Sequence, residues 1–291
     1  MLLKRIEKIL DEHDYIFQEW SGCFDLVARR KDNICLLKIL DNVDSIQETQ
    51  ANNLKMLSHN MSAFTAIVGT HTRREILEND VIYERYGIST MTSSTFSNVL
   101  DDKIPNVYRT RGGFFNKIDS GKLRKARTLD GLTQKQLAEK TGVSKKFVYE
   151  HEKNTMLSEN NIVVRLEKLL GSSIIDNIDI ETGSYEENEP TTLFEKEVCK
   201  ILKNMGFSTD TIYQTPFNII AKEKIMVLSD AEDNEKKLLK KIPALKSFSE
   251  ITKKHVIVIS KNKIDSELPT IESEELEDLS INDLKKIVKK W

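Results

Sequence analysis

Cysteine and glycine are scarce in this chain of 291 residues. Its three cysteines, Cys23, Cys35 and Cys199, form no CxxC pair. Two of them lie inside apolar runs, so we expect reduced core residues rather than disulfides or metal ligands. The 11 glycines form no Gly-rich phosphate loop, and the five histidines show no metal-ligand spacing. We therefore expect no metal ion and no cofactor.

Long hydrophobic runs and an excess of one charge are also missing. The longest apolar runs, such as 34–37 and 256–259, are far shorter than the ~20 residues of a membrane helix. The N-terminus alternates charged and apolar residues and lacks the apolar segment of a secretory signal. These features predict a soluble, cytoplasmic protein without a membrane partner. Because 44 basic and 46 acidic residues nearly cancel, any nucleic-acid site must be local.

One order of apolar segments occurs twice along the chain. In each half, a helical pattern is followed by two β-rich runs, a polar helix and a further apolar run. These segments lie at 6–10, 24–29, 34–37 and 66–69, and again at 198–202, 217–222, 225–228 and 256–259. The order is typical of a small sheet covered by helices. Two copies of one α/β unit are the preferred interpretation; the alternative is that any two α/β segments look alike at this level of detail.

The segment between the halves has a different character. From about 118 to 172, β-rich runs vanish and short helical patterns with cap and turn signals replace them. Thr133 stands at the N-cap of one helix, Gly142 can take a positive φ after it, and Ser144 can cap the next. Two helices therefore meet across a short glycine turn.

Residues 132–152 resemble the helix-turn-helix of the phage repressor/Cro class, also called the XRE family. The positions that agree in type and spacing are Arg124, Leu132, Gln134, Leu137, Ala138, Gly142, Val143, Ser144, Val148 and Glu152. The resemblance implies that the second helix enters the major groove of DNA. Local charge agrees with this function, because the segment from Lys117 to Lys153 contains ten Lys/Arg and only five Asp/Glu.

Five side chains are the predicted DNA-binding residues. If Val148 points into the core, the helical period turns four neighbours outward on one face. They are Lys145, Lys146, Tyr149 and Lys153. Lys145 and Lys146, near the helix start, can reach guanine or phosphate, and Tyr149 can reach thymine methyls or phosphate. Gln134 resembles the family's glutamine, which holds a phosphate together with a helix N-terminus. The alternative for each is a merely solvated side chain.

The first α/β copy resembles the core of restriction-endonuclease-like nucleases. In that core an Asp, followed by Glu-x-Lys on the next strand, binds a divalent metal and orients a water. Asp25 and Lys38 match, but Leu36 stands where the acidic residue belongs, and Asn218 replaces the aspartate in the second copy. We therefore predict degenerate nuclease-like domains without catalytic residues, and no enzyme.

With its linking segments, the full chain is similar to archaeal HTH-type transcriptional regulators. The predicted fold class is multidomain α/β plus all-α, with two related small α/β sheet domains flanking a central repressor-type helix-turn-helix bundle. The predicted domains are 1–115 (α/β), 116–175 (helix-turn-helix), 176–191 (a solvated acidic linker) and 192–291 (α/β).

The leading hypothesis is a sequence-specific regulator of transcription that binds double-stranded DNA as a homodimer, with the α/β copies supplying the dimer contact. A nuclease-derived DNA repair or processing factor is the alternative, in which Glu7 or Glu19 replaces the missing metal ligand. A protein-interaction module that contacts transcription machinery is a third reading. The sequence identifies neither an operator nor a small-molecule effector.

Overall fold

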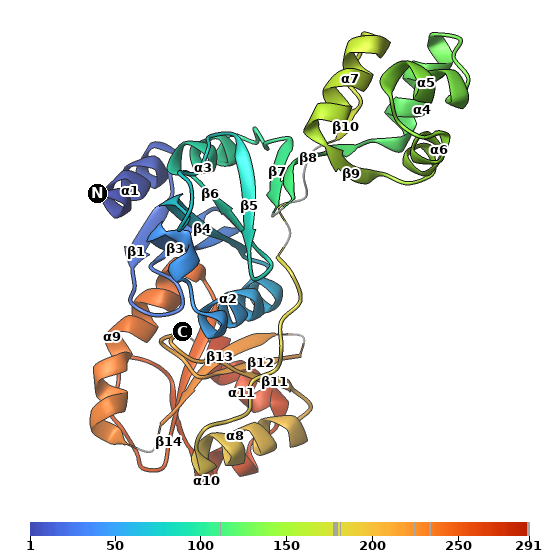
Figure 1. Ribbon diagram of the computed structural model, residues 1–291. Coiled ribbons are helices and arrows are strands. Elements are labelled where there is room, and N and C mark those ends of the chain that lie inside the picture. Colours follow the sequence, from blue (N-terminus) through green and yellow to red (C-terminus); the bar gives the residue numbers. More distant parts are fainter. Residues whose placement is uncertain (111, 177–179, 181, 224, 233, 290–291) are drawn as a thin grey trace.

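The structure is a computed structural model that describes residues 1–110, 112–176, 180, 182–223, 225–232 and 234–289. Figure 1 shows an N-terminal α/β unit, a helical module that projects from it, and a second α/β unit at the C-terminal end. The mixed α/β and helical composition is as predicted. Over these ranges, no helix is long and apolar enough to cross a membrane.

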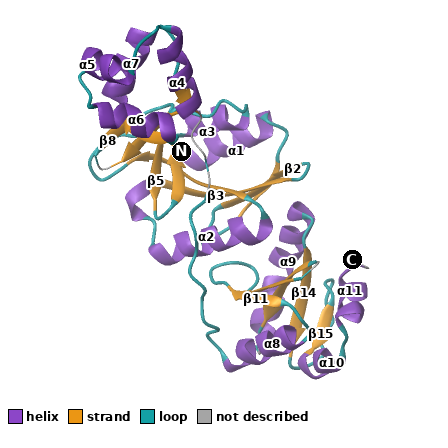
Figure 2. Cartoon of the chain, turned by 90° about the vertical axis from the view of Figure 1, so that its right-hand side faces the viewer, coloured by secondary structure: helices purple, strands orange, loops and turns teal. Residues whose placement is uncertain are grey.

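The first unit is a mixed sheet with helices on both faces. Its elements are α1 (Leu2–Glu12), β1 (Ile16–Glu19), β2 (Leu26–Arg30), β3 (Asn33–Asn42), η1 (Val43–Ser45), α2 (Glu48–Met61), β4 (Phe64–His71), β5 (Val81–Arg85), β6 (Ile88–Met91), α3 (Ser93–Leu100), β7 (Val107–Thr110) and β8 (Gly113–Ile118). The strand order is β1-β2-β3-β4-β6-β5-β7-β8. Helices α1 and α3 share a core on one face, and α2 covers the other (Figure 2).

Strand β3 shows why both faces are covered. Its side chains alternate between the faces, so Leu36 lies in the core beneath α2 and Leu37 in the core beneath α1. Both leucines are fully buried. A strand that is apolar on both sides is stable only when helices cover both sides of its sheet.

The helical module shares a strand with the first unit. It contains α4 (Ser120–Leu129), α5 (Gln134–Thr141), α6 (Lys145–Lys153), β9 (Met156–Glu159), α7 (Asn160–Leu170) and β10 (Ile175–Asp176). Strand β8 pairs with β7 along its first four residues, and its later residues pair with β9 and β10. The expected boundary between residues 115 and 116 therefore falls inside one strand. The expectation of an all-α module without β-runs was wrong at β9 and β10, because the second half of β8 offers backbone partners there.

The second unit contains a five-stranded sheet in the order β11-β12-β13-β14-β15. Its elements are α8 (Leu193–Asn204), β11 (Ser208–Thr211), β12 (Ile219–Lys222), β13 (Met226–Ala231), α9 (Glu235–Thr252), β14 (His255–Ser260), β15 (Thr270–Glu272), α10 (Ser273–Asp278) and α11 (Ile281–Lys289). Leu37 of β3 and Ser229 of β13 hold corresponding positions. Each pairs with an antiparallel strand on one side and a parallel strand on the other.

The two units pack against each other through corresponding helices. Helix α2 of the first unit lies against the second, where the Asn53 amide donates to the Tyr213 carbonyl at 2.9 Å. Helix α9 of the second unit lies against β1 and β2 of the first, and the Arg29 guanidinium donates to the Ile251 carbonyl at the end of α9. Each unit thus packs one of its helices against the other unit.

One apolar core joins the two units. The Phe248 ring of α9 lies 6.0 Å from the Phe24 ring of the first unit and 5.2 Å from the Phe217 ring of the second. All three are buried in the same cluster, together with residues of α2 and β3. The connections before β2 and β12 also meet, since the Cys23 N–H donates to the Gln214 carbonyl at 3.0 Å. All three cysteines are buried, as predicted.

Part of the predicted acidic linker lies against the first unit. The Gly183 N–H donates to the Gly87 carbonyl at 2.9 Å, and Asn52 of α2 exchanges hydrogen bonds with the Glu186 backbone. The expectation of a solvated segment was wrong here, because the polar outer side of α2 offers partners that the acidic composition does not reveal. Residues 177–179 and 181 of this linker lie outside the described residues.

Candidate nucleic-acid interface

The turn between α5 and α6 has the local geometry that the sequence predicts. The Thr133 hydroxyl accepts the Gln136 N–H, and the Gln136 side chain accepts the Thr133 N–H, which closes a capping box before α5. Gly142 ends α5 with φ +69°, a conformation that favours glycine. The Ser144 hydroxyl then accepts the Phe147 N–H at 3.0 Å and starts α6.

Helix α6 is fixed by its inner face. Val148 is fully buried together with Leu137 and Ala138 of α5. The Phe147 ring stacks on the His151 ring at 3.8 Å and packs at the margin of the same core. With its inner face held in this way, α6 has no freedom to rotate, so its outward side chains are positioned by the module's core.

Four of the predicted site residues share the outer face of α6. Lys145, Lys146, Tyr149 and Lys153 are all exposed, and the helical period places them within one arc of about 100°. Tyr149 keeps 49% of its surface exposed. In the part of the chain that the structure describes, the three lysines take part in no ion pair. Their charge is available to an anionic ligand.

Gln134 is placed differently from these four. Its side-chain amide donates to Glu152 Oε2 at 2.7 Å, so one amide proton is already used inside the module. Glu152 also receives the Arg127 guanidinium, through Nε to Oε1 and through Nη2 to Oε2 at 3.0 Å. The Glu152 side chain is 2% exposed. Burial alone would raise its pKa, but Arg127 and Gln134 together hold the pKa of Glu152 below its usual value.

This network joins three helices, since Arg127 lies on α4, Gln134 on α5 and Glu152 on α6. Arg124 of α4 adds a bond to the Glu152 carbonyl at 2.9 Å. The sequence analysis included Arg124 and Glu152 in the resemblance but missed Arg127, whose position one helical turn after Arg124 is the signal that could have indicated it. The network sets how α6 sits on α4 and α5.

The nuclease-like position of the first unit holds an internal ion pair. Lys38 Nζ lies 2.9 Å from Asp25 Oδ1 and 3.0 Å from the Gly22 carbonyl. The other carboxylate oxygen, Asp25 Oδ2, accepts the Ile39 N–H at 2.7 Å. Both oxygens of the only matching carboxylate are therefore occupied by groups of the protein itself.

These residues do not fit the divalent metal that a nuclease of this class would hold. Leu36, fully buried, stands at the second acidic position and offers no oxygen. Glu7 and Glu19, the residues considered as replacements, are both paired with Lys4, at 2.8 and 3.1 Å. Among the described residues, no three His, Cys, Asp or Glu side chains come together in a way that could hold a metal ion.

The corresponding position of the second unit has a different charge arrangement. Asn218 replaces Asp25 and donates to Glu195 Oε1 at 3.0 Å. Asp230, which follows Ser229 as Lys38 follows Leu37, is fully buried and pairs with Lys241 of α9 at 2.9 Å. Burial raises the pKa of Asp230 to about 6, although Lys241 opposes this shift. The Asp230 carboxylate therefore anchors α9 to β13.

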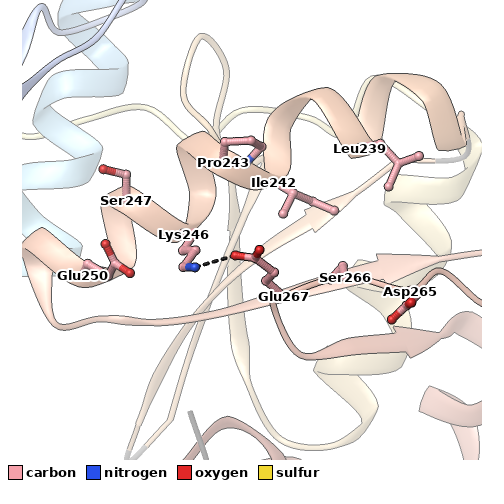
Figure 3. Close-up of a pocket in the computed structure, with 9 residues that line it drawn as sticks. All are labelled: Leu239, Ile242, Pro243, Lys246, Ser247, Glu250, Asp265, Ser266 and Glu267. Carbon is pink, nitrogen blue, oxygen red and sulfur yellow. Dashed lines mark hydrogen bonds and ion pairs between the residues drawn. The ribbon is translucent and has the colours of Figure 1, made fainter.

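A pocket lies on the second unit (Figure 3). In Figure 1, helix α9, which lines it, lies at the opposite end of the molecule from α6. The pocket is formed by α9 and the segment before β15, and the Lys246 ammonium pairs with Glu267 across it. Its remaining lining combines apolar and acidic side chains with two serines. None of the described residues that line this pocket belongs to the helix-turn-helix.

The fold and site define a helix-turn-helix protein built on a nuclease-like α/β unit. A PD-(D/E)XK superfamily domain model matches residues 1–105, and a helix-turn-helix model matches residues 123–176. No solved structure is significantly similar.

Curated relatives match almost the whole chain. A protein of Methanocaldococcus jannaschii named "Putative HTH-type transcriptional regulatory protein MJ1164" is 30% identical over 95% of this chain and 92% of its own length. Relatives with the same description in Methanococcus maripaludis and Pyrococcus furiosus are 30% and 36% identical, over 99% and 81% of this chain and 94% and 74% of their own lengths. The chain belongs to this archaeal family of HTH-type transcriptional regulatory proteins.

Proposed function

We propose that the chain is a sequence-specific, double-stranded-DNA-binding regulator of transcription that inserts α6 into the major groove in the manner of the Cro repressor class. The exposed outer face of α6 carries this proposal. Three lysines that form no ion pair with any described residue share one arc with a half-exposed tyrosine, and the opposite face of the helix is buried. The family and the helix-turn-helix model support the same function.

The five residues would divide the work of recognition. Lys145 and Lys146, in the first turn of α6, reach base edges or phosphates, and Tyr149 meets thymine methyls or a phosphate. Lys153, at the end of α6, contacts the phosphate backbone of the DNA. Gln134 lies at the start of α5, where its remaining amide proton and the helix N-terminus face a phosphate.

Two copies would act together on an inverted repeat. One helix-turn-helix reads only a few base pairs, so specificity requires two modules on half-sites about 34 Å apart. A homodimer provides this arrangement. The second α/β unit would be a further degenerate nuclease-like copy, supported by its corresponding strand register, and both units would act as a non-catalytic scaffold.

The test is selection and sequencing of duplexes bound by the purified protein at about 150 mM salt, which strips much non-specific binding. Wild type should enrich an inverted repeat, and Lys145→Ala/Lys146→Ala should lose it. The matched control is Lys236→Ala/Lys237→Ala, which removes the same charge from exposed positions on α9. It should enrich the same repeat as wild type. If both double variants behave like wild type, α6 does not read DNA and the proposal fails.

A further inference from the structure

We propose that the free edge of β9 is the surface through which a second copy of this chain binds, with the two β9 strands pairing antiparallel about a two-fold axis. The inference rests on the proposed function for its requirement of two modules. It replaces the expectation that the α/β copies supply the dimer contact.

The corresponding surfaces of the two α/β units are buried against each other within one chain. Helices α2 and α9 each cover the other unit, and Phe248 lies between rings of both. Two related units that pair within one chain resemble the two halves of a symmetric dimer. A second chain cannot enter there without displacing this common core, so a symmetric contact between chains has to lie elsewhere.

Strand β9 has an open side. It pairs with β8 and with no other strand of the described chain. An edge strand presents unpaired N–H and C=O groups to any extended partner. The four residues of β9, Met156-Leu157-Ser158-Glu159, include one charged side chain, at the end of the strand, and no proline or lysine.

Two of the four side chains of β9 are apolar and exposed. Leu157 is 48% exposed and Met156 is 40% exposed. Val164, on the helix that follows, adds a third apolar side chain at 53% exposure. Side chains alternate along a strand, so Leu157 and Glu159 lie on one face of β9, and Met156 lies on the other face with Ser158, which is 4% exposed. Exposed apolar side chains beside an unpaired strand edge favour a protein partner.

A second copy is the partner that fits this edge. Antiparallel pairing about an axis at Leu157 sets the two leucines side by side and places Thr155 opposite Glu159 of the other copy, so no like charges meet. Helix α6 ends at Lys153, only two residues before β9 begins. The same axis would therefore relate the two recognition helices directly, without passing through the α/β units.

The experiment is oxidative cross-linking of the full chain carrying Leu157→Cys. Cysteines at this position would face each other across paired strands, where Cα separations of about 4.5–5.5 Å suit a disulfide. The three native cysteines are buried, so we expect them not to cross-link. The matched control is Leu239→Cys, at a comparably exposed leucine on α9. We expect a covalent dimer on a non-reducing gel for Leu157→Cys and none for Leu239→Cys.

A second variant tests the same contact by loss. Leu157→Glu should dissociate the dimer, and light scattering should give the molar mass of a monomer. Its affinity for DNA with one half-site should stay within about twofold of wild type, and its affinity for the inverted repeat should fall at least tenfold. A wild-type monomer, or a dimer that neither cross-links nor responds to Leu157→Glu, overturns the proposal. The proposed function fails separately, by the Lys145→Ala/Lys146→Ala variant binding DNA like wild type.

Discussion

Lys38 in the first unit illustrates how a single residue can keep its place while its chemistry changes. In a nuclease of this class the lysine would act beside two carboxylates and a metal. Here Lys38 is bound to Asp25 and to the Gly22 carbonyl, and Leu36 closes the remaining position. We interpret Asp25 and Lys38 as a structural pair that joins the start of β2 to β3.

We expect Asp25→Ala to lower the free energy of unfolding by roughly 3 kcal/mol, because it leaves the 9%-exposed Lys38 ammonium unpaired. Urea unfolding monitored by circular dichroism measures this. Adding Lys38→Met should recover part of the loss, since no buried charge then remains. A cleavage activity that requires Mg²⁺ and disappears in Asp25→Ala would contradict the structural role and favour the nuclease-derived alternative.

The residue-level predictions for α6 depended on short-range regularity. Val148 is buried and Lys145, Lys146, Tyr149 and Lys153 are exposed because a 3.6-residue period separates the faces of any regular helix. Their contacts with DNA stay predictions. The partner of Gln134 could not be predicted in this way, because Glu152 lies 18 positions later and meets it only after α5 and α6 pack together.

At the scale of elements, the helix-turn-helix is held by one buried carboxylate. Glu152 of α6 binds Arg127 of α4 and Gln134 of α5, so three helices depend on its negative charge. Because the pKa of Glu152 is lowered in the folded module, its stabilising effect is complete above the unfolded pKa of about 4.3 and is lost as pH falls through the folded value.

We therefore expect the stability of this module to fall as the pH drops below about 5, and Glu152→Gln to weaken this dependence. At pH 7 the same substitution should destabilise the module by roughly 2 kcal/mol, because the Arg127 guanidinium loses its charged partner. Hydrogen exchange of peptides from residues 118–172 measures both effects. Glu139→Gln is the control, since Glu139 is exposed and pairs with Lys135 at 3.8 Å. Equal pH profiles for wild type and Glu152→Gln would contradict this role.

At the scale of the whole molecule, the chain has two bodies rather than three. The α/β units share one core, whereas the helix-turn-helix module has its own, built from residues between Ile118 and Ile174. Strand β8 connects the bodies, because its first part belongs to one sheet region and its later part pairs within the module. The orientation of α6 relative to the scaffold is therefore set by a single continuous strand.

We expect Phe248→Ala to destabilise both α/β units together, by about 4 kcal/mol, because it empties a site lined by rings of each. In a Trp291→Phe background, Trp20 is the single tryptophan and reports on the first unit, although Phe248 belongs to the second. The urea midpoint of unfolding, measured by Trp20 fluorescence, should shift to a lower urea concentration in Phe248→Ala. Leu137→Ala, in the separate core of the module, should leave this midpoint unchanged. An unshifted midpoint in Phe248→Ala would mean that the units unfold independently.

The sequence by itself determined the helix-turn-helix, the outward residues of α6 and the order of elements in both α/β units. Caps, turns and hydrophobic periods act between residues a few positions apart, and these signals are local. Only the tertiary structure decided that α2 packs against the second unit and α9 against the first. It also decided that β8 pairs both with β7 of the first unit and with β9 of the helical module, and that Asp230 forms its ion pair with Lys241 of α9. The contacts of α9 with the first unit join residues as far apart as Arg29 and Ile251, 222 positions along the chain, and even the Asp230–Lys241 pair spans 11 positions. No local pattern specifies which apolar face covers which.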